Sequence, residues 1–372
     1  MKLFEFQAKE IFEKFGIETP KGVVFDKPEF DSKLDGVGYP CVLKSQILRG
    51  GRGKAGLIKF ADTPAEAESY AAELYNCGQG VDRLLVVEKG KIKSEIYLSV
   101  TLDPAAATAL VIACADGGVE IETLAKDSPE KIIRERVDID RGILPFQAVN
   151  IAFQLGLEGD LRKGVSKVIM QLYAAFDAYG AELAEINPLF ITTDDKVVAG
   201  DGKFVIDDAV LAKYPEYSMG REYFESDAEF EAAVDGIPYL QFDGDISLMC
   251  AGAGLTTTVY DLINDEGGKV ANYLEFGGPN YRRAKRAMEL CLKNDNKVIL
   301  IVTFGTIARA DVMAEGIVEA MNELKPDVPI VTCIRGTNEE EAVEILKAAG
   351  LEPLFDTEEA VRKAVAIAGG KA

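Results

Sequence analysis

The chain has 372 residues, of which 48% are hydrophobic and 28% are charged, and its formal net charge is −21. This length predicts two or three domains, and this composition is typical of a soluble globular protein. The strong negative charge argues against nucleic acid or an anionic membrane as a partner. Histidine is absent, so the chain itself offers no histidine base, metal ligand or phosphate acceptor.

The N-terminal residues 2–15 (KLFEFQAKEIFEKF) place apolar side chains at nearly helical spacing and predict an amphipathic helix. They lack the apolar core of a signal peptide, and no apolar run in the chain is long enough to cross a membrane. The six cysteines are widely spaced without a CxxC pair, which favours free thiols in a reducing compartment over disulfides. We therefore expect a cytoplasmic location.

A basic, glycine-rich loop follows the strand predicted at Pro40–Gln46. Between Lys44 and Lys59 the chain has five cationic side chains, four glycines and no acid. Such a loop can bring backbone N–H groups close to phosphate, and Lys44 and Arg52 add cationic donors. The loop matches neither the P-loop nor the dinucleotide-binding pattern. A solvated basic loop is the alternative, but the glycines favour an anion-binding loop.

Acidic side chains lie near the ends of the next predicted strands. Residues 83–90 predict a strand that ends in Glu88 and the flexible basic turn around Lys91, and Glu95 begins the following strand. Carboxylates here would suit an adenosine pocket, where they could bond ribose hydroxyls or the exocyclic amine. Acids at strand ends are usually only solvated, and position alone favours that simpler interpretation. A helical region at 146–180 follows.

Residues 185–203 (EINPLFITTDDKVVAGDGK) predict a β-hairpin with a polar tip. A turn centred on this tip pairs Asn187 with Asp201 and Glu185 with Lys203. Because side chains alternate across a strand, these four residues share one face at one end of the hairpin. An amide oxygen opposite a carboxylate, without cysteine or histidine, suits Mg²⁺. The alternative is an ordinary surface hairpin with polar pairs.

The pattern of the chain changes near Asp235. Residues 207–235 are acidic and aromatic without clean periodicity, and we expect a connecting segment there. From Ile237 onward, strand, glycine loop and helix alternate four times, which predicts an open, mainly parallel α/β sheet. Such sheets bind ligands at the carboxyl ends of their strands, although glycines used only for tight turns would explain any single loop. The loops at these ends are Gly252–Gly254, Gly277–Asn280, Gly305–Arg309 and Arg335–Asn338.

The chain resembles, over essentially its whole length, the β subunit of succinate–CoA ligase (succinyl-CoA synthetase). The motifs that carry the resemblance are LFEFQAKEIFEKFGI, KSQILRGGRGKAG, GGVEIE, EINPL…DGK, GAGLT and ANYLEFGG. It implies an α/β fold with an N-terminal ATP-grasp region at 1–235, made of two subdomains (about 1–100 interleaved with 101–235). A flavodoxin-like CoA-ligase domain with an open parallel sheet would follow at 236–372.

The same resemblance implies an acid–thiol ligase of the tricarboxylic acid cycle, which converts ATP, succinate and CoA into succinyl-CoA, ADP and phosphate. Glu185 and Arg52 would be catalytic, and Glu185 would meet a phosphohistidine on a separate α subunit that also binds CoA. Asn187 and Asp201 would hold Mg²⁺. Pro20 stands where GTP-preferring relatives tend to have a side-chain donor, which favours ATP. The ATP phosphates would contact Lys44, Gly51, Arg52 and Gly53. The rest of the nucleotide would contact Glu88, Lys91 and Glu95.

The small carboxylic acid substrate is expected on the C-terminal loops, where the chain departs from the succinate type. Ala251 replaces an asparagine, YLEFGGPN replaces FLDVGGGA, and FGTIARAD replaces FGGIxRCD. Ala251 and the NYLEF stretch lean towards ATP-citrate lyase and citryl-CoA synthetase. Succinate is the default expectation, a citrate– or malate–CoA ligase is the alternative, and a nucleotide-sensing subunit without catalysis is a further one. The expected substrate residues are Ala251, Gly278, Thr306, Ile307, Ala308 and Arg309.

Overall fold

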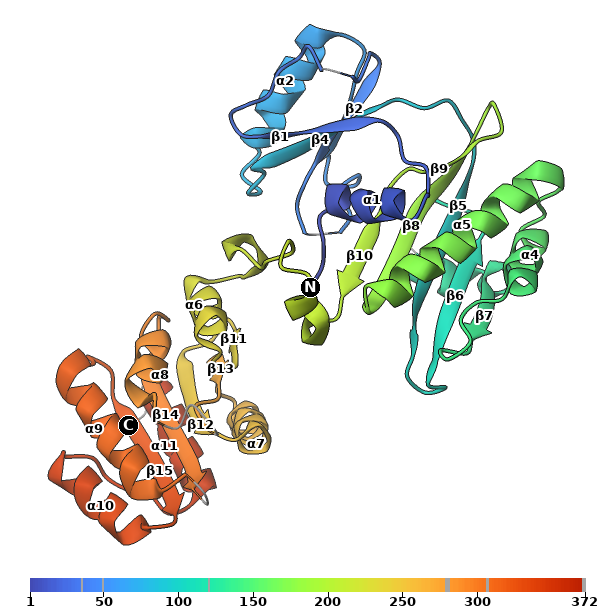
Figure 1. Ribbon diagram of the computed structural model, residues 1–372. Helices are drawn as coiled ribbons and strands as arrows, with labels where there is room; N and C mark the ends of the chain where they lie inside the picture. Colours follow the sequence, from blue (N-terminus) through green and yellow to red (C-terminus); the bar gives the residue numbers. More distant parts are fainter. Residues whose placement is uncertain (35, 49, 120, 278–281, 306–307, 370–372) are drawn as a thin grey trace. The chain divides into compact units, whose positions relative to one another are not determined.

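The chain forms two compact units, Met1–Ser218 and Met219–Ala372 (Figure 1). Among the described residues, no helix combines the length and the apolar character needed to cross a bilayer. The six cysteines are free thiols, five of them buried and Cys77 exposed. The computed structural model describes residues 1–34, 36–48, 50–119, 121–277, 282–305 and 308–369.

The first unit contains helix α1 (Glu5–Lys14) and a four-stranded antiparallel sheet. Helix α2 (Pro64–Tyr75) packs on this sheet through an alanine-rich face. The Thr63 hydroxyl accepts the Glu66 N–H at 3.3 Å and so caps the start of this helix. The strands, in spatial order, are β1 (Gly22–Asp26), β4 (Arg83–Glu88), β2 (Cys41–Ser45) and β3 (Ile58–Ala61).

A second antiparallel sheet in the same unit has the strand order β10-β8-β5-β6-β7, and β9 pairs with β8. Helices α4 (Pro145–Gln154) and α5 (Gly159–Ala178) lie over one face of it (Figure 1). The short helices α3 (Ile121–Asp127) and η1 (Pro129–Lys131) connect β6 to β7. The strands are β5 (Ile92–Asp103), β6 (Thr108–Cys114), β7 (Ile133–Val137), β8 (Ala181–Thr192), β9 (Val197–Ala199) and β10 (Lys203–Ile206).

The hairpin predicted at residues 185–203 is present in the predicted register. Glu185 on β8 pairs with Lys203 on β10, and the pairing of β8 with β9 continues in the same register towards the tip. This register sets Asn187 opposite Asp201. All four side chains therefore lie at one end of the hairpin, as the alternation of strand side chains requires.

The second unit is an open sheet covered on both faces, as predicted. Strands β12, β13, β14 and β15 are parallel, and β11 is antiparallel at one edge. One face packs against α8 (Ala284–Cys291), α9 (Ala310–Leu324) and α10 (Glu339–Ala348), and the other against α7 (Ala253–Asp265) and α11 (Thr357–Ala368). The strands, in spatial order, are β11 (Tyr239–Gln241), β13 (Val270–Leu274), β12 (Ile246–Ala251), β14 (Val298–Gly305) and β15 (Ile330–Gly336).

The segment expected to connect the domains is more structured than its pattern indicated. It contains η2 (Asp208–Lys213), η3 (Arg221–Tyr223) and α6 (Asp227–Asp235). Helix α6 buries only the alanines Ala228 and Ala232, which is why its apolar stripe is faint in the sequence. It packs in the second unit, so the two units divide at residue 218 whereas the sequence placed the boundary near residue 235.

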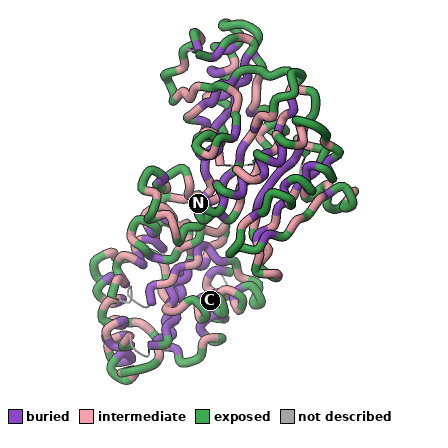
Figure 2. The backbone as a smooth tube through the Cα atoms, turned by 45° about the vertical axis from the view of Figure 1, so that its right-hand side comes forward, coloured by how far each residue is buried: buried purple, intermediate pink, exposed green. Residues whose placement is uncertain are grey.

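Burial follows the strands in both units. In Figure 2 the buried stretches of the backbone run through the sheets, and the exposed stretches follow loops and the outer faces of helices. Polar exceptions inside these buried regions are few, and several of them gather in the first unit near α1 and β2. These buried polar groups point to the candidate site, because burying a charge is costly unless it is paired.

Candidate functional site

A cavity of about 800 Å³ in the first unit brings together residues from five separate parts of the chain. Its walls come from the start of the chain, the glycine-rich loop, Tyr97 on the second sheet, residues 118–119 and 121–123, and the inner end of the hairpin. Six of the residues predicted from the sequence line it, and they are Gly51, Arg52, Gly53, Glu185, Asn187 and Asp201. The glycine loop and the hairpin therefore share one cavity, although about 130 residues separate them in the sequence.

Arg52 joins the glycine loop to the hairpin. Its guanidinium donates to both carboxylate oxygens of Asp201 at 2.9 Å and to the Ser45 carbonyl at 3.1 Å. The same group lies 2.8 Å from the Glu5 carboxylate, and only 12% of the side chain is exposed. Burial alone would lower the pKa of Arg52, but Asp201 and Glu5 raise it above its usual value. Gly51 has a φ of +74°, a conformation that favours glycine.

Glu5 is a buried acid that the sequence analysis did not single out. Its carboxylate lies 2.7 Å from Lys44, 2.9 Å from Lys9 and 2.8 Å from Arg52. Burial would raise the pKa of Glu5, but the three cations hold it well below its usual range. The sequence did contain a sign of this buried acid, because Glu5 and Lys9 are four residues apart on the face of α1 that also buries Ala8 and Phe12.

Lys44 lies behind the wall of the cavity. Its ammonium donates to Glu5 at 2.7 Å and to the Gly200 carbonyl at 2.8 Å, and the residue is buried. Lys44 therefore contacts Glu5, the acid that also pairs with Arg52. Lys44 is not among the described residues that line the cavity in which the sequence predicted phosphate. Both cations are held by Glu5, and Arg52 is the one that reaches the cavity.

Glu88, Lys91 and Glu95 are not among the described residues that line this cavity. Glu88 is exposed and accepts the Lys21 N–H at 3.2 Å, and Lys91 is exposed as well. Glu95 is partly buried, and its carboxylate packs so close to Gly118 that a Cβ there would come within 2.5 Å of it. These three predicted nucleotide residues remain predictions, outside the cavity that joins loop and hairpin.

The side-chain oxygens of both predicted metal ligands accept hydrogen bonds from protein donors. Asp201 accepts from Arg52 and from the Gly202 N–H, the latter at 2.7 Å. The Asn187 amide oxygen accepts the Gly118 N–H at 2.8 Å, and its NH₂ group donates to the Val119 carbonyl at 3.0 Å. A carboxylate and an amide oxygen are suitable Mg²⁺ ligands when phosphate oxygens and water complete the coordination. Among the described residues, no group of three or more acidic, cysteine or histidine side chains could hold a metal alone.

Glu185 lies on the same face as the predicted metal ligands. The Tyr97 hydroxyl donates to its Oε2 at 2.9 Å. Burial raises the pKa of Glu185, although Tyr97 and Lys203 partly oppose this rise. The pKa of Tyr97 is also raised, first by its burial and then by the neighbouring carboxylate of Glu185. Lys2, which the sequence analysis did not consider, also lines the cavity, and burial, Lys203 and Arg52 lower its pKa.

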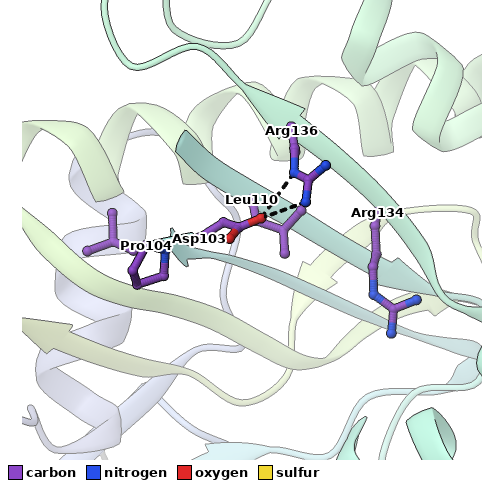
Figure 3. A pocket seen from close by; sticks show the side chains of 6 residues that line it. Asp103, Pro104, Leu110, Arg134 and Arg136 are labelled. Carbon is purple, nitrogen blue, oxygen red and sulfur yellow. Dashed lines mark hydrogen bonds and ion pairs between the residues drawn. The ribbon is translucent and has the colours of Figure 1, made fainter. Parts of the chain in front are cut away.

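A second, smaller hollow of about 470 Å³ is lined by residues of β5, β6 and β7 and by Pro104 (Figure 3). Arg136 donates to Asp103 there at 3.0 Å, and Figure 3 shows Arg134 apart from this ion pair. The Arg136 side chain is 68% exposed. This hollow therefore offers one neutralised and one exposed arginine, whereas the larger cavity has a glycine loop and buried charges. We assign the candidate site to the larger cavity.

In the second unit, the three predicted substrate residues that the structure describes lie where strands end and helices begin. Ala251 ends β12, and Gly252, with a φ of +101°, precedes α7. Arg309 precedes α9 and its guanidinium donates to Asp311, which lowers the pKa of Asp311 to about 2. Ala308 is half-buried beside it. Three further predicted residues, Gly278, Thr306 and Ile307, lie outside the described residues.

Comparison with known proteins identifies both halves of the chain. Residues 2–191 match the family described as ATP-grasp domain, and residues 249–367 match the family described as CoA-ligase. The chain is 59% identical to the ADP-forming sulfoacetate-CoA ligase subunit SauC of Bilophila wadsworthia, over 100% of both proteins. It is 55% identical to the ADP-forming sulfoacetate-CoA ligase subunit SqwK of Acholeplasma sp, over 100% of this chain and 92% of that one.

Relatives named for succinate and a solved structure show a more distant similarity. The β subunit of succinate–CoA ligase [ADP-forming] from Ignicoccus hospitalis is 41% identical over 99% of both chains. The structure of ATP citrate lyase from Methanothrix soehngenii in complex with citrate and coenzyme A has a TM-score of 0.73 at 21% identity, over 98% of each chain. This likeness, with the two family matches, confirms the predicted fold. The chain belongs to the succinyl-CoA synthetase superfamily of ADP-forming CoA ligases, and it is part of an acid–thiol ligase that joins an ATP-grasp domain to a CoA-ligase domain.

Proposed function

We propose that the chain is the nucleotide-binding subunit of an ADP-forming sulfoacetate–CoA ligase. The reaction would convert ATP, sulfoacetate and CoA into sulfoacetyl-CoA, ADP and phosphate. The observation that carries this proposal is the identity along the full length of the chain. It is 59% and 55% with two relatives named for sulfoacetate, against 41% and 38% with relatives named for succinate. Sulfoacetate therefore replaces succinate, the default expectation, as the proposed substrate.

The chemistry of the two acids is consistent with the departures in the C-terminal loops. Both acids carry the carboxylate that becomes the thioester, and they differ at the other end. A sulfonate is tetrahedral and has three oxygens, whereas a carboxylate is planar and has two. Ala251, which is partly exposed at the end of β12, is smaller than the asparagine of the succinate type and would leave more room. Arg309, with 54% of its side chain exposed, would supply a cationic donor.

We assign nucleotide binding to the 800 Å³ cavity of the first unit. Arg52 and the backbone of Gly51 and Gly53 would bind the phosphates of ATP, which are the anions that a cationic glycine loop suits. Asn187 and Asp201 would hold Mg²⁺ together with those phosphates. The metal would neutralise charge on the phosphoryl oxygens during transfer, where most of the catalysis in phosphoryl transfer lies.

We further propose that a partner α subunit supplies the histidine that carries the phosphoryl group and binds CoA. The chain contains no histidine, and its most similar relatives are named as subunits. Glu185 would accept a hydrogen bond from one imidazole nitrogen of that histidine, while the other nitrogen attacks the γ-phosphorus and ADP leaves. The bond from Tyr97 holds Oε2 of Glu185, which leaves Oε1 to orient the histidine.

The test is a comparison of acids in a complex of the full chain with its α subunit. CoA-dependent ADP formation would be measured with sulfoacetate, succinate, citrate and malate at equal Mg²⁺ and ATP. We expect kcat/KM for sulfoacetate to exceed that for each other acid by about 100-fold, which is about 2.7 kcal/mol of discrimination. A complex carrying Asp201→Asn serves as the control for contaminating activity. Succinate, citrate or malate turning over best would overturn the substrate assignment.

The same assay separates the catalytic subunit from a nucleotide sensor. A sensor would bind ADP and ATP but would form no ADP with any acid, even with the α subunit present. Retention of Glu185, Asn187 and Asp201 around one cavity with Arg52 favours the enzyme, because a sensor needs neither paired metal ligands nor Glu185.

A further inference from the structure

We propose that Glu5 is a positioning residue for nucleotide binding: its buried carboxylate, at the wall of the cavity, fixes Arg52 of the glycine loop and Lys44 of β2. The inference rests on the proposed function of the cavity as an ATP site. Glu5 does not act on the nucleotide itself, but through the cations that it holds.

The geometry shows one carboxylate shared by three cations. Glu5 Oε1 lies 2.7 Å from Lys44 and 2.9 Å from Lys9, and Oε2 lies 2.8 Å from Arg52. The Glu5 side chain is only 1% exposed. These contacts join three elements that are distant in the sequence, namely the first turn of α1, strand β2 and the glycine-rich loop.

The glycine loop has little packing of its own to hold it in place. At Gly50, Gly51, Gly53 and Gly56, an added Cβ would meet no atom within 4 Å. The Arg52 side chain, in contrast, is 12% exposed and bonded to Ser45, Asp201 and Glu5. The anchored arginine therefore adds a fixed point to the loop, and the more buried of its two acidic anchors is Glu5.

The charges of the cluster explain why an acid is needed there. Glu5 and Asp201 carry negative charge, and Lys9, Lys44 and Arg52 carry positive charge, so one excess positive charge remains. Without Glu5, three neighbouring cations would repel each other with one carboxylate left among them. Arg52, which sits on the unpacked loop, is the cation most able to move away.

Isothermal titration of the full chain with Mg-ADP tests the inference. We expect Glu5→Gln to raise the Kd for Mg-ADP at least tenfold, because the amide keeps the shape of the acid but not its charge. Arg52→Met should raise the Kd similarly, and the double variant should be no weaker than Arg52→Met alone. Such non-additivity is expected when one residue acts through the other. Additive losses, or an unchanged Kd in Glu5→Gln, would overturn the positioning role.

Lys9→Met is the matched control, since Lys9 belongs to the cluster but not to the described lining of the cavity. It leaves the contacts of Glu5 with Lys44 and Arg52 intact, and the Kd should stay within twofold of the wild-type value. If Glu5→Gln does not fold, the charge-balanced variant Glu5→Gln/Lys9→Met takes its place with the same expected loss. Failure of the wild-type chain to bind Mg-ADP would refute the nucleotide site itself, whereas wild-type binding without loss in the variant refutes only the role of Glu5.

Discussion

Replacement of Asp201 by asparagine separates the structural role of this residue from its proposed metal role. The carboxylate accepts two bonds of 2.9 Å from Arg52 and one of 2.7 Å from the Gly202 N–H, and its side chain is 27% exposed. Asparagine keeps one acceptor oxygen but loses the charge. Hydrogen bonds to charged groups contribute about 1.5–3 kcal/mol, and Arg52 retains its contact with Glu5. We therefore expect a loss of about 2 kcal/mol in unfolding free energy.

Such a loss lowers the midpoint of thermal unfolding by about 4–8 °C for a unit of this size, and the fold should survive. Transfer of ³²P from ATP to the histidine of the α subunit should fall at least 100-fold, because the metal would lose its carboxylate ligand. The control is Asp195→Asn at the tip of the same hairpin, where the side chain is 59% exposed and pairs with Lys93. It should change transfer less than twofold. Normal ³²P transfer in folded Asp201→Asn protein would refute the metal assignment.

Three further outcomes follow from the described contacts. Tyr97→Phe removes the hydrogen bond that lowers the pKa of Glu185 against the effect of burial, so the acidic limb of the rate profile for histidine phosphorylation should move to higher pH. The pKa of Glu5 is held below its ordinary value of 4.5 by the neighbouring cations, so its contribution to stability is present above pH 4.5 and is lost as pH falls through the folded pKa. The difference in urea midpoint between wild type and Glu5→Gln should therefore shrink as pH drops below 4.5. Gly336→Ala should destabilise the second unit by about 2–3 kcal/mol in urea unfolding, because φ is +116° and the new Cβ would lie 1.9 Å from the Gly305 carbonyl oxygen.

Each of these outcomes has a result that contradicts it. An unshifted acidic limb in Tyr97→Phe would show that Glu185 does not control the rate in that pH range. A constant difference in urea midpoint at pH 6 and pH 4 would show that Glu5 does not carry the acid-side stability. Gly254→Ala is the control for Gly336→Ala, since its Cβ would meet no atom within 4 Å. Equal stabilities of the two alanine variants would contradict the steric argument.

The register of the hairpin could be predicted because two apolar strands and a polar tip leave one pairing that keeps the apolar side chains together. Alternation along each strand then fixed the common face of Asn187, Asp201 and Glu185. Alternating strands and helices likewise predicted the second unit, since a parallel sheet covered on both faces needs continuous apolar strands.

Long-range partners were beyond the reach of sequence patterns. Helical periodicity marked the apolar face of α1, but it could not show that Glu5 on that face meets cations from β2 and the glycine loop. Lys44 was expected at the phosphate because it ends a strand beside the loop, and its burial against Glu5 depends on the placement of another element. Helix α6 was not predicted because only alanines form its buried side, and small side chains give a weak apolar periodicity in the sequence.

Asn187 and Asp201 each hold a different segment through hydrogen bonds. Asn187 bonds Gly118 and Val119, and Asp201 bonds Arg52. A bare Mg²⁺ ion would have to compete with these donors for both oxygens, which would leave Arg52 only Ser45 and Glu5 as partners and would take the acceptor of the Gly118 N–H. Phosphate oxygens arriving with the ion would replace the lost acceptors. Free metal in the surrounding solution should therefore occupy the hairpin poorly, and the order of assembly would be set by the nucleotide that brings the ion in.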